Sequence, residues 1–292
     1  MKSIISLFFL AILLTLSTLS ATAKAPLTLK VFNPGEKSIF PVTSSLIIGQ
    51  REVILVDAQF QRNDALTLVS MIKETGKTLT TIYISHGDPD YYFGLEVIKS
   101  AFPKARILSS PTTKAYIEKT AAPKLKYWGP ILGKNAPTQT YIPEAIKGDT
   151  LTIDNQVVNV VGLDGHDPKH TFLWIPSLRT IVGGVSVFDN MHAWLADSQT
   201  PQSRQDWQKT LNQMNALHPK RVVPGHFLGK QNNNASAIGF IQTYLNKFED
   251  SANKAKNSKE LIQLMKQHYP NIKGDALLEL SAKVIEGEQQ WP

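Results

Sequence analysis

From residue 27 onward, short apolar and β-branched runs alternate with segments in which apolar residues recur at helical spacing. This alternation predicts a layered α/β fold, because strands repeat every two residues and helices about every 3.6. Strands are predicted over residues 27–32, 45–48, 52–57, 80–85, 151–153, 157–161, 171–175, 180–182 and 221–223. Helices are predicted from an Asn63 cap to Gly76, over 92–102 and over 203–217, followed after residue 234 by three helical pieces broken near Asn257 and at Pro270.

Residues 123–147 interrupt this alternation. The segment holds four prolines and two glycines, at Pro123, Gly129, Pro130, Gly133, Pro137 and Pro143. Proline removes a backbone donor and glycine favours turns, so the segment predicts a surface flap with neither a helix nor a continuous strand.

The first residues have the pattern of a secretory leader. Met1-Lys2 is followed by an apolar run over residues 3–14 and by the small-residue sequence Ala21-Thr22-Ala23. We predict a signal peptide over residues 1–23, and hence a periplasmic or secreted protein with no stable membrane association after cleavage. The alternative is an uncleaved membrane anchor, because the run approaches the length that spans a bilayer.

Composition excludes several classes of protein. The 292 residues are 42% hydrophobic and 19% charged, as in ordinary globular proteins. There is no cysteine, so a disulfide framework, a thiolate metal site and a cysteine nucleophile are all excluded. Lys and Arg outnumber Asp and Glu by 31 to 24, but they are scattered singly. This scattered charge indicates solubility rather than nucleic-acid binding. As the partner we expect a small-molecule substrate.

Candidate chemistry is concentrated where predicted strands end. His86, Asp88 and Asp90 lie within one five-residue loop directly after an apolar strand. His166 and His226 each follow a glycine in later loops between strand patterns. Imidazoles and carboxylates at such spacing are metal ligands, so the set predicts a metal site.

These residues, in this order, resemble the metallo-β-lactamase superfamily. The resemblance covers residues 27–228, and its motifs are Asp57, Ser85-His86-x-Asp88-x-Asp90 with Gly94, Gly165-His166, Gly183-Gly184 and Pro224-Gly225-His226. It implies a four-layer αββα sandwich with the metal site at one edge. The domain would span residues 24–230, and residues 231–292 would be a helical extension added to it.

The chain departs from the usual family loop, His-x-His-x-Asp-His. Asp88 stands at the second histidine, Tyr91 at the last, and Val185 at the bridging Asp or Cys position. By analogy the first metal site is His86, Asp88 and His166, while the second site keeps only Asp90 and His226. We therefore expect one divalent ion, with zinc as the default and Mn²⁺ or Fe²⁺ favoured somewhat by the added carboxylate.

The remaining polar residues have several possible roles. Asp90 is a candidate general base or water-orienting group, and His226 either holds developing negative charge or completes a weaker second site. Tyr91 either donates a hydrogen bond to the reacting groups or fills the space of an imidazole. His170 is a candidate partner of a metal-bound histidine, and Asp189 or His192 a candidate replacement for the missing bridging ligand.

Three function classes follow. An exported metal-dependent hydrolase, opening an ester, lactone, thioester or amide bond, is favoured because a three-ligand site has no evident structural purpose here. A catalytically degenerate metal- or ligand-binding protein on the same fold is the second reading. Redox chemistry of the flavodiiron kind is the third, but the sequence has no Gly-rich flavin loop.

Overall fold

A computed structural model describes residues 25–165, 167–231 and 234–291. The predicted leader, residues 1–23, and the predicted ligand His166 lie outside the described residues. In the part of the chain that is described, no helix is both long enough and apolar enough to cross a membrane.

The first sheet has six strands in the order β1-β2-β3-β4-β5-β6. The first three strands are antiparallel neighbours, whereas β3 to β6 run parallel. Its strands are β1 (Thr28–Phe32), β2 (Ser44–Ile48), β3 (Glu52–Val56), β4 (Thr78–Ile84), β5 (Arg106–Ser109) and β6 (Glu144–Ala145). Strands β2 and β3 are buried along almost their whole length, which agrees with their apolar runs over residues 46–48 and 53–56.

The second sheet has five strands in the order β12-β10-β9-β8-β7. They are β7 (Thr150–Ile153), β8 (Gln156–Val161), β9 (Phe172–Ile175), β10 (Thr180–Val182) and β12 (Arg221–Val222), and a separate parallel pair is formed by β11 (Phe188–Asp189) and β13 (His226–Phe227). Apolar side chains from both sheets, including Ile54, Tyr83, Val158 and Leu173, form one buried cluster between them.

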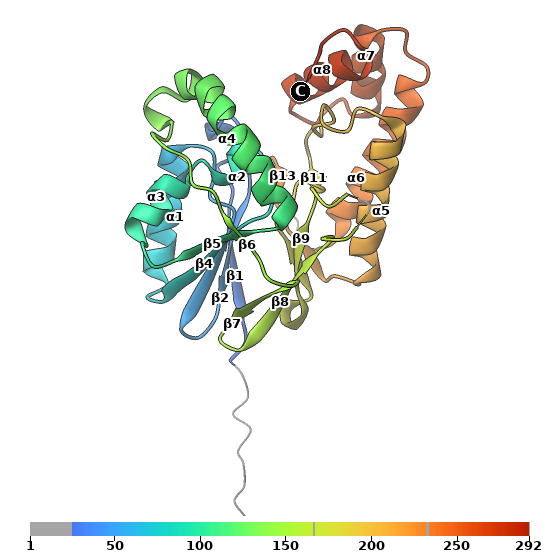
Figure 1. The fold of residues 1–292 in the computed structure, drawn as a ribbon. Coiled ribbons are helices and arrows are strands. Elements are labelled where there is room, and N and C mark those ends of the chain that lie inside the picture. The colour runs from blue at the N-terminus through green and yellow to red at the C-terminus, as the bar shows by residue number, and fades with distance from the viewer. Residues whose placement is uncertain (1–24, 166, 232–233, 292) are drawn as a thin grey trace, which may run out of the picture.

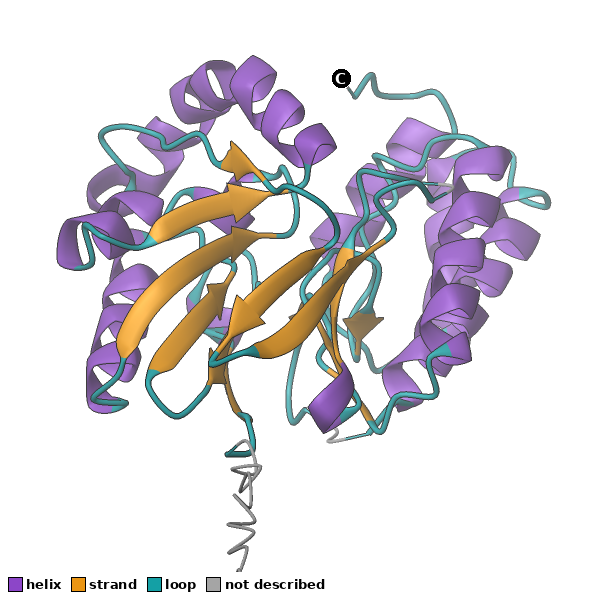
Figure 2. Cartoon of the chain, turned by 60° about the horizontal axis from the view of Figure 1, so that its bottom comes forward, coloured by secondary structure: helices purple, strands orange, loops and turns teal. Residues whose placement is uncertain are grey.

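Helices cover the outer faces of the two sheets (Figures 1 and 2). Helices α1 (Arg62–Glu74) and α3 (Leu95–Ala101) lie on the side of the first sheet, and α5 (Pro201–Ala216) and α6 (Ser236–Ala252) lie on the side of the second. The architecture is therefore the αββα sandwich that the resemblance to the metallo-β-lactamase superfamily implies.

The prediction of a flap over residues 123–147 was wrong for residues 123–132, which are helical. Helix α4 (Pro111–Leu132) runs through Pro123 and Pro130. The N-terminus of α4 is stabilised by its cap, because the Ser110 side chain accepts a hydrogen bond from the Thr113 amide. Pro111 is favourable in the first turn, where no backbone donor is needed. Buried contacts of Ile117, Ala121 and Leu132 then outweigh the poor local propensity of the internal prolines.

Smaller differences concern element ends and short elements. The single helix predicted over 92–102 is two pieces, α2 (Pro89–Tyr92) and α3. Helix α1 begins at Arg62 and Gln61 is its N-cap residue, whereas the Asn63 side chain bonds to Asp64 inside the helix. The short strands β5, β6, β11 and β13 had not been predicted.

Three C-terminal helices follow residue 234, as predicted: α6, α7 (Ser258–His268) and α8 (Asp275–Ile285). Their buried residues, among them Ile241, Met265 and Leu278, belong to the same apolar core as α1, α3 and α5. These helices therefore pack on the rest of the fold, and α7 and α8 stand at the same end of the molecule as α4 (Figure 1).

Candidate active site

The candidate site lies where β4 ends, and Asp57 fixes the start of its loop. Asp57 follows β3 with a positive φ of 64°, a conformation that Asp tolerates better than most residues. Its carboxylate accepts hydrogen bonds from the Ser85 amide at 2.8 Å and the Ser85 hydroxyl at 2.7 Å. Burial raises the pKa of Asp57 to about 8 although the two Ser85 bonds lower it. The loop that begins with His86 is thus anchored to β3.

His86 is buried immediately after this anchor. Its Nδ1 atom accepts a hydrogen bond from the Asp88 amide at 3.3 Å, and its ring stacks on His170 with 5.4 Å between ring centroids. Burial lowers the pKa of His86 to about 3, even though the Asp88 carboxylate beside it acts in the opposite direction. His86 is therefore a neutral imidazole, the form that binds metals.

Asp88 is paired with a lysine that the sequence analysis missed. The Lys124 ammonium, on helix α4, lies 2.6 Å from Asp88 Oδ1 and 3.3 Å from the Gly87 carbonyl oxygen. It also lies 4.5 Å from the centre of the Tyr116 ring. Burial alone would raise the pKa of Asp88, but His86 and Lys124 hold it below its ordinary value. No sequence signal singled out Lys124, because its segment had been interpreted as a flap.

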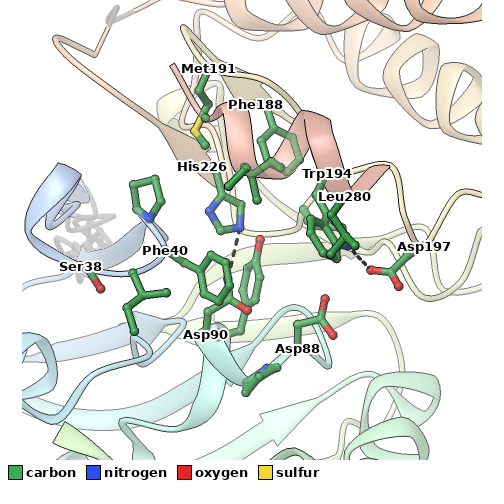
Figure 3. Close-up of a pocket in the computed structure, with 18 of the residues that line it drawn as sticks. Ser38, Phe40, Asp88, Asp90, Phe188, Met191, Trp194, Asp197, His226 and Leu280 are labelled. Atoms are coloured by element: carbon green, nitrogen blue, oxygen red, sulfur yellow. Dashed lines mark hydrogen bonds and ion pairs between the residues drawn. The ribbon is translucent and has the colours of Figure 1, made fainter. Parts of the chain in front are cut away.

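Asp90 and His226 form a second pair across the site. Asp90 Oδ2 lies 3.3 Å from His226 Nε2, and the His226 ring stacks on Phe188 at 5.0 Å between centroids (Figure 3). Burial raises the pKa of Asp90 although its hydrogen bond with His226 lowers it. The pairing of β11 with β13 brings Phe188 and His226 together.

Tyr91 stands between the two histidines of the site. Its ring contacts His86 at 5.1 Å and His226 at 5.7 Å between centroids, both edge to face. The side chain is only 1% exposed, and its hydroxyl has no hydrogen-bond partner among the described residues. Burial raises the pKa of Tyr91 well above its ordinary value, so the group is a phenol that can donate a proton in a hydrogen bond.

Five of these residues line a cavity of about 490 Å³: Asp88, Asp90, Tyr91, Lys124 and His226. His86 does not line the cavity but lies beside it, in ring contact with Tyr91. Figure 3 shows Asp88 and Asp90 at one end of the cavity, with Phe188, Met191 and Leu280 among the apolar side chains around the rest. A concave, mostly apolar cavity with a few convergent polar groups is the usual form of a small-molecule site.

Other predicted residues lie elsewhere or outside the described chain. His192 is fully buried and its Nδ1 lies 2.9 Å from the Tyr244 hydroxyl of α6, so it faces the core beneath the C-terminal helices. Neither His192 nor Asp189 is among the residues that line the cavity, whereas Val185 is. His170 lies beside His86, with its Nδ1 atom 2.5 Å from Asp167 Oδ2.

The donor set fits a divalent cation in its chemistry. Of the described residues that line the cavity, Lys124 is the only Lys or Arg, against Glu36, Asp88, Asp90 and Asp197. This excess of negative charge beside a neutral imidazole favours a cation. Within the described ranges no group of three or more His, Asp or Glu residues forms a complete ligand set. The third predicted ligand, His166, is outside those ranges.

Comparison with known families identifies the fold. A model of the family described as the metallo-beta-lactamase superfamily matches residues 39–226. The chain belongs to this superfamily. Its members typically bind divalent metals, often zinc.

Solved structures of metallo-beta-lactamases share the fold of this superfamily member. The metallo-beta-lactamase from Pontibacter korlensis aligns with a TM-score of 0.53 and 16% identity, covering 75% of this chain and 93% of that one. Metallo-beta-lactamase IND-7 aligns with a TM-score of 0.56 and 18% identity over 76% and 94% of the two chains. DIM-1 metallo-beta-lactamase exposed to ceftazidime aligns with a TM-score of 0.52 and 16% identity over 77% and 98%. Comparison with curated proteins gives no match.

Proposed function

We propose that the protein is an exported, metal-dependent hydrolase that opens an ester, lactone, thioester or amide bond in a small molecule. The observation that carries the proposal is that two carboxylates and an unpartnered phenol line one cavity while the neutral imidazole of His86 lies directly against them, 3.5 Å from the Asp88 carboxylate and in ring contact with Tyr91. Membership of a superfamily of hydrolases supports it.

A single divalent ion would be held by His86, Asp88 and His166. Zinc is the default, and the Asp88 carboxylate favours Mn²⁺ or Fe²⁺ more than an imidazole would. When bound, such an ion supplies Lewis acidity and lowers the pKa of water at the site toward about 7. Asp90 and His226 would give a second ion only two protein ligands, so we propose one ion.

Asp90 is the general base of the proposed reaction. Burial raises the pKa of Asp90 toward neutral pH. A general base is most effective when its pKa lies near the pH at which the enzyme works. The neighbouring His226 holds one Asp90 oxygen in place at 3.3 Å. His226 also faces the cavity, where it can stabilise negative charge that develops on the substrate.

Tyr91 is the hydrogen-bond donor for the substrate carbonyl oxygen. Its buried hydroxyl is without an acceptor within the described structure, and Tyr91 lines the cavity. A carbonyl oxygen bound there would provide the missing acceptor, and the bond would strengthen as the oxygen gains charge.

The ion pair between Lys124 and Asp88 favours a second candidate function. An ammonium 2.6 Å from one Asp88 oxygen already neutralises part of the proposed ligand set. A catalytically degenerate protein that binds a ligand in the cavity would be consistent with that pairing.

The test combines metal analysis with an activity panel. Purified protein should contain one ion per chain and hydrolyse esters or lactones better than β-lactams, since β-lactam hydrolysis in this superfamily generally uses fuller ligand sets. His86→Ala and His166→Ala should lose metal and activity together while remaining folded, and His268→Ala, on the exposed end of α7, should lose neither. Folded wild-type protein that holds no metal and is inert on the whole panel would support ligand binding instead.

Export is proposed from the leader over residues 1–23. Cleavage after Ala23 would leave Lys24 as the first residue of the mature protein. Sequencing the amino terminus of protein recovered from the periplasm or the medium should read from Lys24. An intact Met1, or retention in the membrane fraction, would contradict export as a cleaved protein.

A further inference from the structure

We propose that the bond opened at this site is carried on an extended apolar chain, which occupies the cavity between helix α4 and the C-terminal helix α8. The inference rests on the proposed function and names its substrate class. The apolar part of the cavity is called the apolar chamber below, and it is defined by Phe40, Trp128, Phe188, Met191, Trp194 and Leu280.

The apolar chamber is built from segments far apart in the sequence. Phe40 precedes β2, Trp128 lies on α4, Met191 follows β11 and Leu280 lies on α8. Phe40 and Trp128 pack edge to face at 5.4 Å between ring centroids, and both contact Phe60 beneath them. The walls are therefore supported by core packing rather than by loops alone.

Polar groups are confined mainly to one end of the cavity. Asp88, Asp90 and His226 lie together there, and Lys124 is ion-paired with Asp88. Glu36, Ser38 and Asp197 also line the cavity. Glu36 is ion-paired with Lys273, and Asp197 accepts hydrogen bonds from the indole nitrogens of Trp194 at 2.6 Å (Figure 3) and Trp291 at 2.8 Å. A ligand that places a carbonyl at the polar end and hydrocarbon against the remaining walls matches this division.

Part of the wall of the apolar chamber comes from C-terminal residues outside the region that matches the family model. Leu277 and Leu280 of α8, together with Trp291, line the cavity but lie beyond the 39–226 region that matches the family model. Trp291 is fixed there, because its ring packs edge to face on Trp194 at 5.1 Å and its carbonyl accepts a hydrogen bond from Gln199.

Apolar side chains continue from the chamber to the protein surface. Ile39 and Tyr127 line the cavity and are 45% and 63% exposed. Large exposed apolar side chains at the opening of an apolar cavity can bind an apolar ligand before it enters the cavity.

The test measures binding without hydrolysis. Straight-chain 2-alkanones of about four to ten carbons present a carbonyl that the enzyme cannot cleave, and isothermal titration calorimetry with the full mature chain measures their affinity. Each added methylene buried in the chamber should tighten binding about fourfold, equivalent to about 0.8 kcal/mol, until the chamber is full.

Three variants on α8, one of them a control, test whether the gain in affinity with chain length arises in the apolar chamber. Leu280→Asp places a charge in the wall and should abolish the gain with chain length, whereas Glu279→Gln, exposed on the same helix and not lining the cavity, should leave it unchanged. Ala276→Phe removes no packing and should fill part of the chamber, so the gain should stop at a shorter chain. This variant keeps the test decisive if Leu280→Asp does not fold.

The outcomes separate the inference from the proposed function. A chain-length gain that Ala276→Phe shortens would establish the chamber even if the matching esters are not hydrolysed, in which case only the proposed function fails. Hydrolysis of short and long esters at equal efficiency, with 2-alkanone affinity independent of chain length, would overturn the inference and leave the hydrolase standing. Equal chain-length gains in wild-type protein, Leu280→Asp and Ala276→Phe would also overturn it.

Discussion

The ammonium of Lys124 lies 2.6 Å from Oδ1 of Asp88, the carboxylate that stands at the second histidine position of the family motif. A histidine at that position would be neutral, whereas Asp88 adds a negative charge. Lys124, on helix α4, neutralises that charge by forming an ion pair with Asp88. A divalent cation at Asp88 must therefore compete with an ammonium already in place.

Removing the ammonium should strengthen metal binding. Lys124→Met keeps most of the apolar stem and frees the Asp88 carboxylate, so the affinity for Zn²⁺ or Mn²⁺ should rise about tenfold, or about 1.4 kcal/mol. Metal titration of the chelator-treated protein measures this change. Lys126→Met, at an exposed position on the same helix that does not line the cavity, is the matched control. Weaker metal binding in Lys124→Met would show that the lysine positions Asp88 as a ligand instead of competing for it.

Tyr91→Phe should separate stability from turnover. The variant removes a buried hydroxyl that lacks a partner within the described residues, so the metal-free protein should gain about 1 kcal/mol of unfolding free energy. Turnover should fall about tenfold or more with metal content unchanged, because the hydroxyl is the proposed donor to the substrate oxygen. Denaturant unfolding, steady-state kinetics and metal analysis measure the three quantities.

Tyr92 supplies the control for that experiment. Its hydroxyl is likewise buried without a partner in the described chain, but the residue does not line the cavity. Tyr92→Phe should therefore show a similar gain in stability and wild-type turnover. If Tyr91→Phe behaves in the same way, Tyr91 has a packing role only.

His192 should make the protein less stable in acid. Burial lowers the pKa of His192 from 6.5 to about 4, although Asp275 acts in the opposite direction. Between these values the unfolded chain binds a proton that the folded chain does not, so stability falls as the pH falls from 6.5 toward 4, by at most about 1.4 kcal/mol per pH unit. Above pH 6.5 this contribution is constant.

Unfolding free energies measured from pH 4 to 7.5 test this effect. His192→Gln keeps a hydrogen-bonding group for Tyr244 but does not titrate, so its stability should fall less steeply in acid. His268→Gln, at an exposed position, should follow the wild-type curve. Parallel curves for His192→Gln and wild-type protein would rule out His192 as the source of the acid sensitivity.

Local sequence predicted much of the fold because most elements carry a regular pattern. β2, β3 and β10 are apolar runs bounded by turn residues, and their positions were predicted to within one or two residues. Helix α4 was not predicted because Pro123 and Pro130 are unfavourable in any isolated helix, and only tertiary packing makes the segment helical. Strands of two residues, such as β11 and β13, carry no detectable period.

The candidate site was predictable as far as its residues follow one another. His86, Asp88, Asp90 and Tyr91 lie within residues 86–91, which run from the loop after β4 into α2. The structure places Asp88, Asp90 and Tyr91 on the cavity together with His226, and His86 against Tyr91. Lys124 joins them through a contact between residues 36 apart in the chain, and Leu280 joins them through the C-terminal fold. Such contacts depend on how the helices pack against the rest of the fold. The spacing of residues along the sequence does not determine that packing.

Metal-dependent hydrolysis is the central claim, and reconstitution of chelator-treated mature protein tests it most directly. Zn²⁺ or Mn²⁺ is added in steps while bound metal and hydrolysis of a medium-chain ester or lactone are measured on the same samples. The account predicts no hydrolysis without metal, activity that rises in proportion to occupancy, a plateau at one ion per chain, and neither binding nor activity in His86→Ala. Full hydrolysis by metal-free protein, or one ion bound per chain in His86→Ala, would contradict it.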